Sequence, residues 1–396
     1  MSKYIIIIAV IYSMVILLPT GSSAATDNIY TLDEITPAPT WEGTTGNRLQ
    51  SSSTYGDESV VTFNLPWDFV FYGHTYSAGT PVILDTNGNI WFNSNISTSA
   101  HSFGLDTTAG RGPVIAAWND DLSSAYYGGV FVQHKTDLPL GERVVVEWQT
   151  ETQADEGLFA PNSFETILFK DGRIRTDYQS IKTTQGADAG SGISKGANGS
   201  YLSVTSNFTQ VPAMTTTSPR SFLYTPIPAA VNVTINGSGS GSVSFSPSNS
   251  ACNSNCSENF LRSQQVTLNP AASSYSLFTG WTVGACTGFI TTPCILTLNA
   301  DATTTATFDK DTAHQVNVNG VYYSTIQAAY NAAADGANIK LWATDYSETV
   351  TCSSSKTVTF NGGYDSTYAT VVGPIILNGS LIIKNGKVIA NGLTIR

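Results

Sequence analysis

The stretch PVILDTNGNIWF (residues 81–92) decides the fold class of this chain. Two apolar runs, residues 81–84 and 90–92, flank a polar segment that contains Asn87 and Gly88. Asn-Gly between apolar runs is a strong hairpin signal, because both residues tolerate the positive φ of a tight turn. The stretch therefore predicts two antiparallel strands joined by a short turn.

Strands of the same kind continue on both sides of this hairpin, from about residue 31 to residue 224. A second hairpin is predicted at residues 164–178, where Lys170-Asp171-Gly172 joins two strand-like runs. No helical period extends over a useful length in this part of the chain. Short strands with turn signals between them are typical of an antiparallel β-sandwich.

The segment PVIAAWNDDL (residues 113–122), followed by GGVFV (residues 128–132), resembles the core of the nidogen-like extracellular domain. Later segments follow in the same order, and the resemblance covers most of residues 40–225. It implies a β-rich, non-catalytic module of matrix and surface proteins, and hence adhesion or assembly. We expect this domain at residues 31–225, followed by a linker at residues 226–230.

Residues 231–308 hold short strands, a Gly-Ser run and four of the five cysteines: Cys252, Cys256, Cys286 and Cys294. The segment resembles the divergent internalin-type B-repeat of bacterial surface proteins, a small β module that serves as a spacer. A clustered, even set of cysteines in an exported chain indicates disulfides, whereas a zinc site would need a different spacing.

Chain entropy does not select the pairing of these cysteines. A 252–294 bridge would stabilise by about 4 kcal/mol, and each of two local bridges by roughly 2–2.5 kcal/mol. The B-repeat resemblance and the turn-rich loops imply the local pairs, Cys252 with Cys256 and Cys286 with Cys294.

The last segment, residues 314–396, opens with the one predicted helix, Ser324 to Ala334. Ser324 is the expected N-cap, and one apolar face of the helix carries Ile326, Ala329, Tyr330 and Ala333. Short strands separated by Asn-Gly turns then recur with the short period of β-helix rungs. A helix followed by such rungs resembles the N-terminal cap and first coils of a pectate-lyase-like right-handed β-helix.

Cys352, the fifth cysteine, lies in this segment. We expect a buried, unpaired thiol there, and an intermolecular bridge is the alternative. The predicted fold class is therefore mainly β. It combines an antiparallel β-sandwich, a small disulfide-containing β module and a short right-handed β-helix with an N-terminal capping helix.

Residues 1–25 are typical of a signal peptide. Lys3 precedes an almost wholly apolar run, and small residues at positions 22–25 provide a cleavage site after Ala24 or Ala25. We expect a secreted or cell-surface protein, with a retained membrane anchor as the alternative. The net charge of −11 and the lack of any basic run argue against binding to nucleic acid or anionic membranes. No later segment is apolar enough to span a membrane.

Four residues are candidates for binding. Asp120 and Asp121 could hold calcium in a loop or cap a turn. Tyr126 and Tyr127 could stack on a sugar or anchor a partner, or pack over the edge of the sandwich. Residues 85–89 look like the start of a calcium loop, but its twelfth position is Ile96 instead of glutamate. We therefore expect no metal and no cofactor, with calcium as the alternative.

The sequence contains no recognisable catalytic arrangement. Its four histidines are scattered, and neither a GxSxG elbow nor a P-loop is present. We expect a non-catalytic role in adhesion, carbohydrate or matrix binding, or structural assembly. The expected partners are an extracellular glycan or a surface or matrix protein, and self-association through the β-helix edge is a further expectation.

The alternative is a polysaccharide-acting enzyme, a lyase or hydrolase, or a truncated remnant of one, with the β-helix as its scaffold. Such an enzyme needs acidic or basic residues gathered on one face of the coils. Only Asp345, Glu348 and Asp365 are acidic after Asp335, and no catalytic residue is expected.

Overall fold

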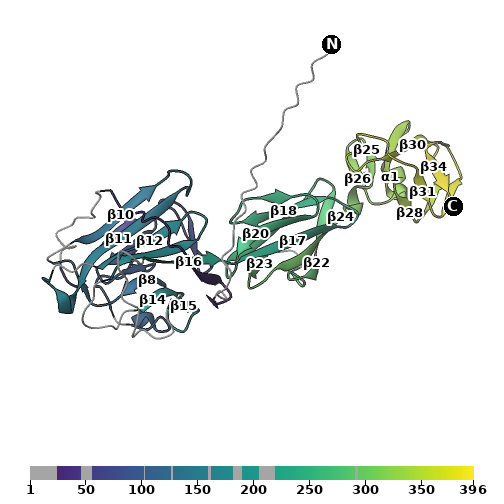
Figure 1. Ribbon diagram of the computed structural model, residues 1–396. Helices are drawn as coiled ribbons and strands as arrows, with labels where there is room; N and C mark the ends of the chain where they lie inside the picture. The colour runs from purple at the N-terminus through teal and green to yellow at the C-terminus, as the bar shows by residue number, and fades with distance from the viewer. Residues whose placement is uncertain are drawn as a thin grey trace, which may run out of the picture. The chain divides into compact units, whose positions relative to one another are not determined.

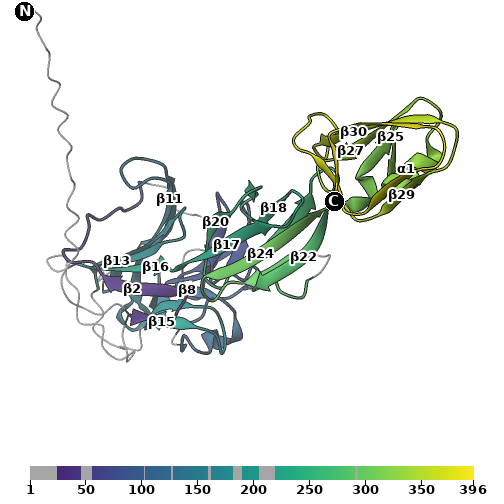
Figure 2. The same cartoon turned by 90° about the vertical axis from the view of Figure 1, so that its right-hand side faces the viewer.

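The computed structural model describes residues 25–45, 56–101, 103–125, 128–158, 162–181, 190–204, 219–289 and 293–396. The predicted signal peptide, residues 1–25, lies outside the described residues except for Ala25. The chain divides into two compact units, Met1–Ile227 and Pro228–Arg396, which Figures 1 and 2 draw in purple to teal and in green to yellow. In the described parts of the chain, no helix has the length and apolar character needed to cross a bilayer.

The first unit contains two large antiparallel sheets. The eight-stranded sheet has the order β1-β2-β16-β13-β12-β11-β10, with β9 beside β11, and the six-stranded sheet has the order β15-β14-β8-β7-β6-β3. The strands of the larger sheet are β1 (Ala25–Thr26), β2 (Tyr30–Glu34), β9 (Leu122–Ser123), β10 (Gly129–Lys135), β11 (Arg143–Thr152), β12 (Asn162–Phe169), β13 (Ile174–Ser180) and β16 (Arg220–Pro226). Those of the smaller sheet are β3 (Val60–Asn64), β6 (Pro81–Asp85), β7 (Asn89–Trp91), β8 (Val114–Asn119), β14 (Gly190–Ser194) and β15 (Tyr201–Ser203). A separate hairpin pairs β4 (Phe69–Phe71) with β5 (His74–Tyr76), and short 3-10 turns lie at Thr108–Gly110 and Gln153–Asp155.

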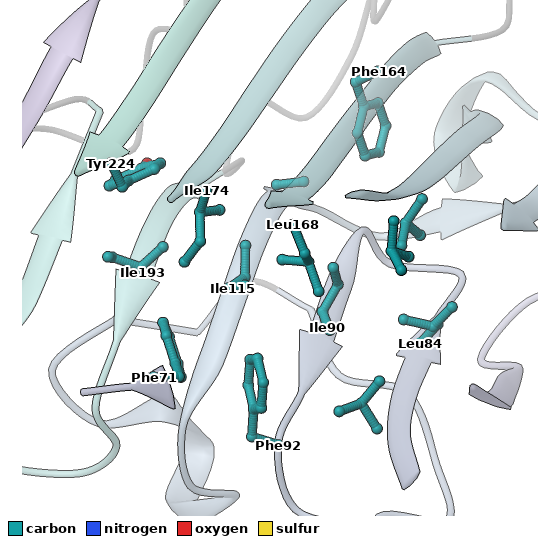
Figure 3. Packing of buried hydrophobic residues seen from close by; sticks show 14 of the residues in the cluster. Phe71, Leu84, Ile90, Phe92, Ile115, Phe164, Leu168, Ile174, Ile193 and Tyr224 are labelled. Atoms are coloured by element: carbon teal, nitrogen blue, oxygen red, sulfur yellow. The ribbon is translucent and has the colours of Figure 1, made fainter. Parts of the chain in front are cut away.

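One apolar core lies between these two sheets (Figure 3). Ile90 and Ile115 reach it from the six-stranded sheet, and Leu168 and Ile174 reach it from the eight-stranded sheet. A strand points alternate side chains to opposite faces, so one face of each sheet can be buried in this way. The indole nitrogen of Trp148 also donates across the core to the backbone oxygen of Asp85, at 2.8 Å. The two sheets thus pack face to face, as the strand pattern predicts.

The hairpin predicted at residues 81–92 is present, since β6 and β7 pair antiparallel with Leu84 opposite Ile90. This register centres the turn on Asn87. Gly88 has a φ of 79°, and a Cβ there would lie 2.3 Å from the backbone oxygen of Trp118. Glycine is therefore needed both for the backbone conformation and for the close approach of β8.

The second unit begins with two four-stranded sheets, in the orders β20-β17-β24-β22 and β19-β18-β21-β23. Of their pairings only β17 with β24 is parallel among the residues described. Their strands are β17 (Pro228–Asn236), β18 (Gly241–Ser246), β19 (Ala251–Cys252), β20 (Cys256–Leu261), β21 (Gln265–Ala272), β22 (Ser276–Gly284), β23 (Cys294–Thr297) and β24 (Ala302–Lys310). Since β16 ends at Pro226 and β17 starts at Pro228, the linker predicted at residues 226–230 is reduced to Ile227.

Beyond a 3-10 turn at Thr312–His314, the chain forms parallel strand stacks. β27-β30-β33, β28-β31-β34 and β29-β32 are parallel, and β25 and β26 extend the first stack antiparallel. The strands are β25 (Val316–Val318), β26 (Val321–Tyr323), β27 (Ala337–Trp342), β28 (Asp345–Tyr346), β29 (Thr349–Cys352), β30 (Thr357–Tyr364), β31 (Ile375–Leu377), β32 (Ser380–Ile383), β33 (Lys387–Asn391) and β34 (Leu393–Ile395). Successive passes of the chain therefore add strands beside those of the pass before.

Helix α1 (Ile326–Ala332) precedes these stacks and is shorter than predicted. Its N-cap is Thr325, whose hydroxyl accepts from the backbone N–H of Ala328, so the prediction of Ser324 was wrong by one residue. A capping oxygen must reach the third helical residue, and helical backbone starts only at Ile326. The predicted apolar face is confirmed, because Ile326, Ala329, Tyr330 and Ala333 are all buried.

Candidate functional site

The predicted pair Asp120 and Asp121 lies in the short turn between β8 and β9. Asp120 is buried, and its carboxylate accepts from the backbone N–H of Asp121 at 2.9 Å. Asp121 is half-buried, and its carbonyl accepts from the backbone N–H of Gln153 at 2.8 Å. Asp120 thus has the local role of a turn-capping side chain, and Asp121 is the one that faces other ligand-type groups.

Asp121 meets Glu58 and His101, which sequence reasoning missed. One possible ligand atom from each of the three residues lies within 4.8 Å of the other two. The Nε2 of His101 is 3.6 Å from a Glu58 carboxylate oxygen. No short sequence spacing could reveal this cluster, because the three residues are far apart in the chain and flank different strands of the six-stranded sheet.

The surroundings of this cluster are strongly acidic. Burial raises the pKa of the neighbouring Asp57 carboxyl, and the charges of Asp121 and Glu58 raise it further. Glu156 is close by and accepts from the Ser123 hydroxyl at 2.6 Å. Carboxylate oxygens suit Ca²⁺, whereas an imidazole nitrogen beside carboxylates suits a transition metal.

The β6–β7 turn contacts the cluster through hydrogen bonds of Asn87. Asn87 is buried; its amide nitrogen donates to Glu58 at 3.3 Å, and its oxygen accepts from the backbone N–H of Leu122 at 2.7 Å. Asp85 is fully buried and accepts from Asn89 and from the Trp91 indole at 2.7 Å. Burial raises the pKa of Asp85 to about 7 against the effect of these hydrogen bonds. These buried side chains hold the turn in place through their hydrogen bonds.

The predicted aromatic pair, Tyr126 and Tyr127, lies outside the described residues.

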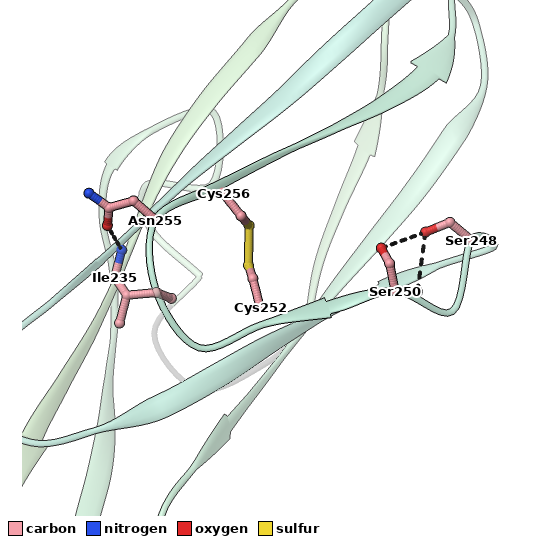
Figure 4. Close-up of a disulfide and its surroundings, with 6 residues drawn as sticks. All are labelled: Ile235, Ser248, Ser250, Cys252, Asn255 and Cys256. Atoms are coloured by element: carbon pink, nitrogen blue, oxygen red, sulfur yellow. Dashed lines mark hydrogen bonds between the residues drawn. A yellow bond between two sulfur atoms is a disulfide. The ribbon is translucent and has the colours of Figure 1, made fainter. Parts of the chain in front are cut away.

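Both expected local disulfides are formed. Cys252 is joined to Cys256 and Cys286 to Cys294, with Cα atoms 6.3 and 5.7 Å apart. Figure 4 shows the first bridge, beside which Asn255 accepts from the backbone N–H of Ile235 at 2.9 Å.

Each bridge is local in sequence but connects the two sheets of the small module. Cys252 lies in β19 and Cys256 in β20, which belong to different sheets. Cys286 follows β22 of one sheet, and Cys294 begins β23 of the other. The four cysteines are therefore structural cross-links.

Cys352 is a free, buried cysteine in β29, as predicted. It packs in the apolar cluster of the C-terminal stacks, and burial raises the pKa of its thiol. A buried thiol with a raised pKa has little of the reactive thiolate form at neutral pH.

Each acidic residue of the C-terminal segment has a local structural partner. Glu348 accepts from the backbone N–H groups of Ile326 and Gln327 at the start of α1, at 2.7 and 3.0 Å. Asp345 accepts from the side-chain amide of Asn378, and hydrogen bonds from Thr367 lower the pKa of Asp365. These hydrogen bonds give the three carboxylates local structural roles.

Comparison with known proteins identifies one family. The model of a family described as NIDO related matches residues 30–235, which is more than half of the chain. No curated protein gives a match to the chain. Among solved structures, the major pilin protein (T-13) of Streptococcus pyogenes is 8% identical, with 66% of this chain and 93% of the pilin covered and a TM-score of 0.15. A similarity this low carries no argument about fold or function.

Proposed function

Because the chain belongs to the NIDO-related family, we propose that it is a secreted or cell-surface, non-catalytic protein that acts in adhesion to an extracellular glycan or a surface or matrix protein. The family match carries this proposal, since it extends over the described strands of both sheets of the first unit except β1. Two disulfides in the second unit are compatible with an extracellular location, because disulfides persist in oxidising compartments.

Export and adhesion are tested together by expressing the full chain and a variant that lacks residues 2–25 in a bacterial host. The full chain is expected outside the cytoplasm, with a new N-terminus after Ala24 or Ala25 by mass analysis, and cells that display it should adhere to a glycan- or matrix-coated surface. Retention of the full chain in the cytoplasm would contradict the assigned location. Equal adhesion by cells with and without the protein would contradict the assigned role.

For the second unit we propose a B-repeat-like spacer at residues 231–308 and the first coils of a right-handed β-helix at residues 314–396, with α1 as its cap. The parallel stacks β27-β30-β33 and β28-β31-β34 support this assignment, because a β-helix is built from such stacks. An experimental structure with antiparallel pairing of these strands would contradict it.

The same stacks favour one alternative function, a polysaccharide-acting enzyme. Against it, the acidic residues Asp345, Glu348 and Asp365 have the structural partners described above. Incubation of the purified protein with pectin-like and other acidic polymers should leave their length unchanged. Depolymerisation that is lost in a variant of these residues would establish the enzyme and contradict the non-catalytic proposal.

We also propose that the edge of the C-terminal stacks supports self-association. Exposed apolar side chains lie on its outer strands: Ile382, Ile383, Ile389 and Ile395. Open strand edges invite pairing with another chain. Light scattering should give a mass that rises with concentration and becomes monomeric in an Ile389→Lys variant, and a concentration-independent monomer would contradict the proposal.

We also propose a divalent-cation site whose ligands are Asp121, Glu58 and His101. The charge of a cation would offset the repulsion between the neighbouring carboxylates of Glu58 and Asp121. Calcium or zinc should raise the unfolding temperature of the wild type and not that of Asp121→Asn. Equal shifts in both proteins, or none in either, would rule out this site.

A further inference from the structure

A groove lies at one end of the six-stranded sheet, away from the acidic cluster. Trp91, the last residue of β7, lies opposite Val114 of β8, and Val114 lies opposite Ser194 at the end of β14. Antiparallel pairing therefore brings both ends of the β7–β8 loop and the loop after β14 together at the same end of the sheet. Together with the β4–β5 hairpin, these loops enclose an open hollow of about 460 Å³. This volume is within the usual range of small-ligand sites, roughly 300–1,000 Å³.

Four aromatic rings form a continuous wall of this groove. The ring centroids of Phe71 and Phe92 are 4.5 Å apart, those of Phe92 and Tyr76 are 4.7 Å apart, and those of Tyr76 and His74 are 4.6 Å apart. Phe71 and Phe92 are buried in the core between the sheets, and Figure 3 shows both (with labels). The wall is thus anchored at one end in the core, and His74 at its other end is exposed.

The described part of the groove's rim is polar. Asn93, Ser94 and Lys195 lie on it, and none of the described residues that line the groove is acidic. Asn93 is held in place, because its amide nitrogen donates to the Arg111 carbonyl at 2.9 Å and its oxygen accepts from the Asn95 N–H at 3.1 Å. The chain as a whole is acidic, with a net charge of −11. The described lining of this groove differs in charge, because it contains a lysine and no acidic residue.

We propose that this groove binds a saccharide that carries a carboxylate, such as a uronic acid unit. The apolar face of a sugar ring would pack on Tyr76 and its aromatic neighbours, and the sugar hydroxyls would reach Asn93 and Ser94. The carboxylate would lie near the Lys195 ammonium. The Tyr76 hydroxyl, like that of any tyrosine, is protonated at neutral pH and can donate a hydrogen bond, and burial raises its pKa further, to about 12.

A peptide fits this place less well than a saccharide. A peptide that adds to a sheet needs an unpaired strand edge. The groove lies at the ends of strands, and β8 already has β14 and β7 on its two sides. The mixed aromatic and hydroxyl-binding lining within a short hollow suits a compact ligand with alternating apolar and polar faces.

The test uses the full chain without residues 1–25 and two probes of matched length. One probe is an oligosaccharide of alternating glucuronic acid and N-acetylglucosamine, and the other contains N-acetylglucosamine only. Titration calorimetry should show saturable binding of the acidic probe, at least about fivefold tighter than the neutral one. Lys195→Glu should lower the affinity for the acidic probe about tenfold or more, since attraction between the side chain and the probe's carboxylate becomes repulsion. The matched control Lys384→Glu makes the same charge change at an exposed position in the second unit and should have no effect.

The aromatic wall is tested by Tyr76→Ala and, for a variant that leaves the core intact, by His74→Ala at the exposed end. Both substitutions should lower the affinity for the acidic probe. Tyr201→Ala should not, because Tyr201 is an exposed tyrosine on β15. Unchanged binding in Lys195→Glu and His74→Ala, or no binding of the acidic probe by the wild type, would overturn the proposal. Tyr76-dependent binding of a proline-rich peptide in place of the saccharide would overturn the ligand class.

This inference deepens the proposed adhesive function and rests on it, but the two can fail separately. If cells that display the groove variants adhere as well as cells that display the wild type, the groove is not the adhesive site and the adhesive function stands. If the purified protein binds the acidic probe but displaying cells do not adhere, the groove stands and the adhesive function is wrong.

Discussion

Two buried carboxyl groups, those of Asp85 and Glu165, link the stability of the first unit to pH. Burial raises the pKa of Asp85 to about 7, and burial together with nearby Asp177 also raises that of Glu165. The folded chain therefore holds these protons to a higher pH than the unfolded chain does. We expect the free energy of unfolding to fall as pH rises from about 5 to about 8, because unfolding then releases protons.

Denaturant titrations at several pH values measure this slope. Asp85→Asn should flatten it, and Glu165→Gln provides a second variant in case the first fails to fold. Asp106→Asn, an exposed residue of the same unit, should keep the wild-type slope. A stability that rises through this range in the wild type would contradict the expected effect of the two carboxyls.

Gly88 is the residue on which the central hairpin depends most. Gly88→Ala adds a positive-φ strain and a clash with the Trp118 carbonyl, so it should cost roughly 2–4 kcal/mol of unfolding free energy. Gly141→Ala is the matched control, since Gly141 also has a positive φ but open space around it. It should cost only about 1–2 kcal/mol. Equal losses in the two variants would show that the close approach at Gly88 does not matter.

At this scale the sequence is informative where interactions are local. The Asn87-Gly88 signal correctly predicts the turn, because turn chemistry is a property of adjacent residues. The meeting of Glu58, His101 and Asp121 could not be predicted, because it depends on strand registers across the sheet. The groove around Tyr76 was missed for the same reason, since its walls come from four separate segments.

Among the elements, the disulfides determine how firmly the small module holds its two sheets together. Cys286 and Cys294 are fully buried, whereas Cys252 and Cys256 are only partly buried. Replacing Cys286 and Cys294 by alanine should cost about 2.5 kcal/mol of unfolding free energy, and replacing Cys252 and Cys256 about 2 kcal/mol. Hydrogen exchange in β21 and β24 measures both effects, and faster exchange in neither variant would contradict a structural role for the bridges.

Element types were predicted better than element boundaries. The apolar face of α1 follows from its 3.6-residue period, but its start shifts from Ser324 to Thr325 because the cap depends on where helical backbone begins. The predicted linker at residues 226–230 contains two prolines, Pro226 and Pro228. Strand β17 nevertheless includes Pro228, which shows that composition alone does not exclude a strand.

For the whole molecule, family membership is the strongest guide to function, because it covers the first unit nearly from end to end. The second unit is not covered beyond its first strand. Its disulfides and parallel strand stacks are structural features. Its carboxylates accept hydrogen bonds in a turn and at the start of α1. We therefore propose that recognition is a role of the first unit.

The most direct test of this account is to probe an array of glycans and extracellular proteins with the purified chain that lacks residues 1–25, while the products in each glycan spot are monitored. The account predicts saturable binding to at least one extracellular component, with every bound glycan left intact. Binding to no component of the array, or cleavage of a polysaccharide into shorter products, would contradict it.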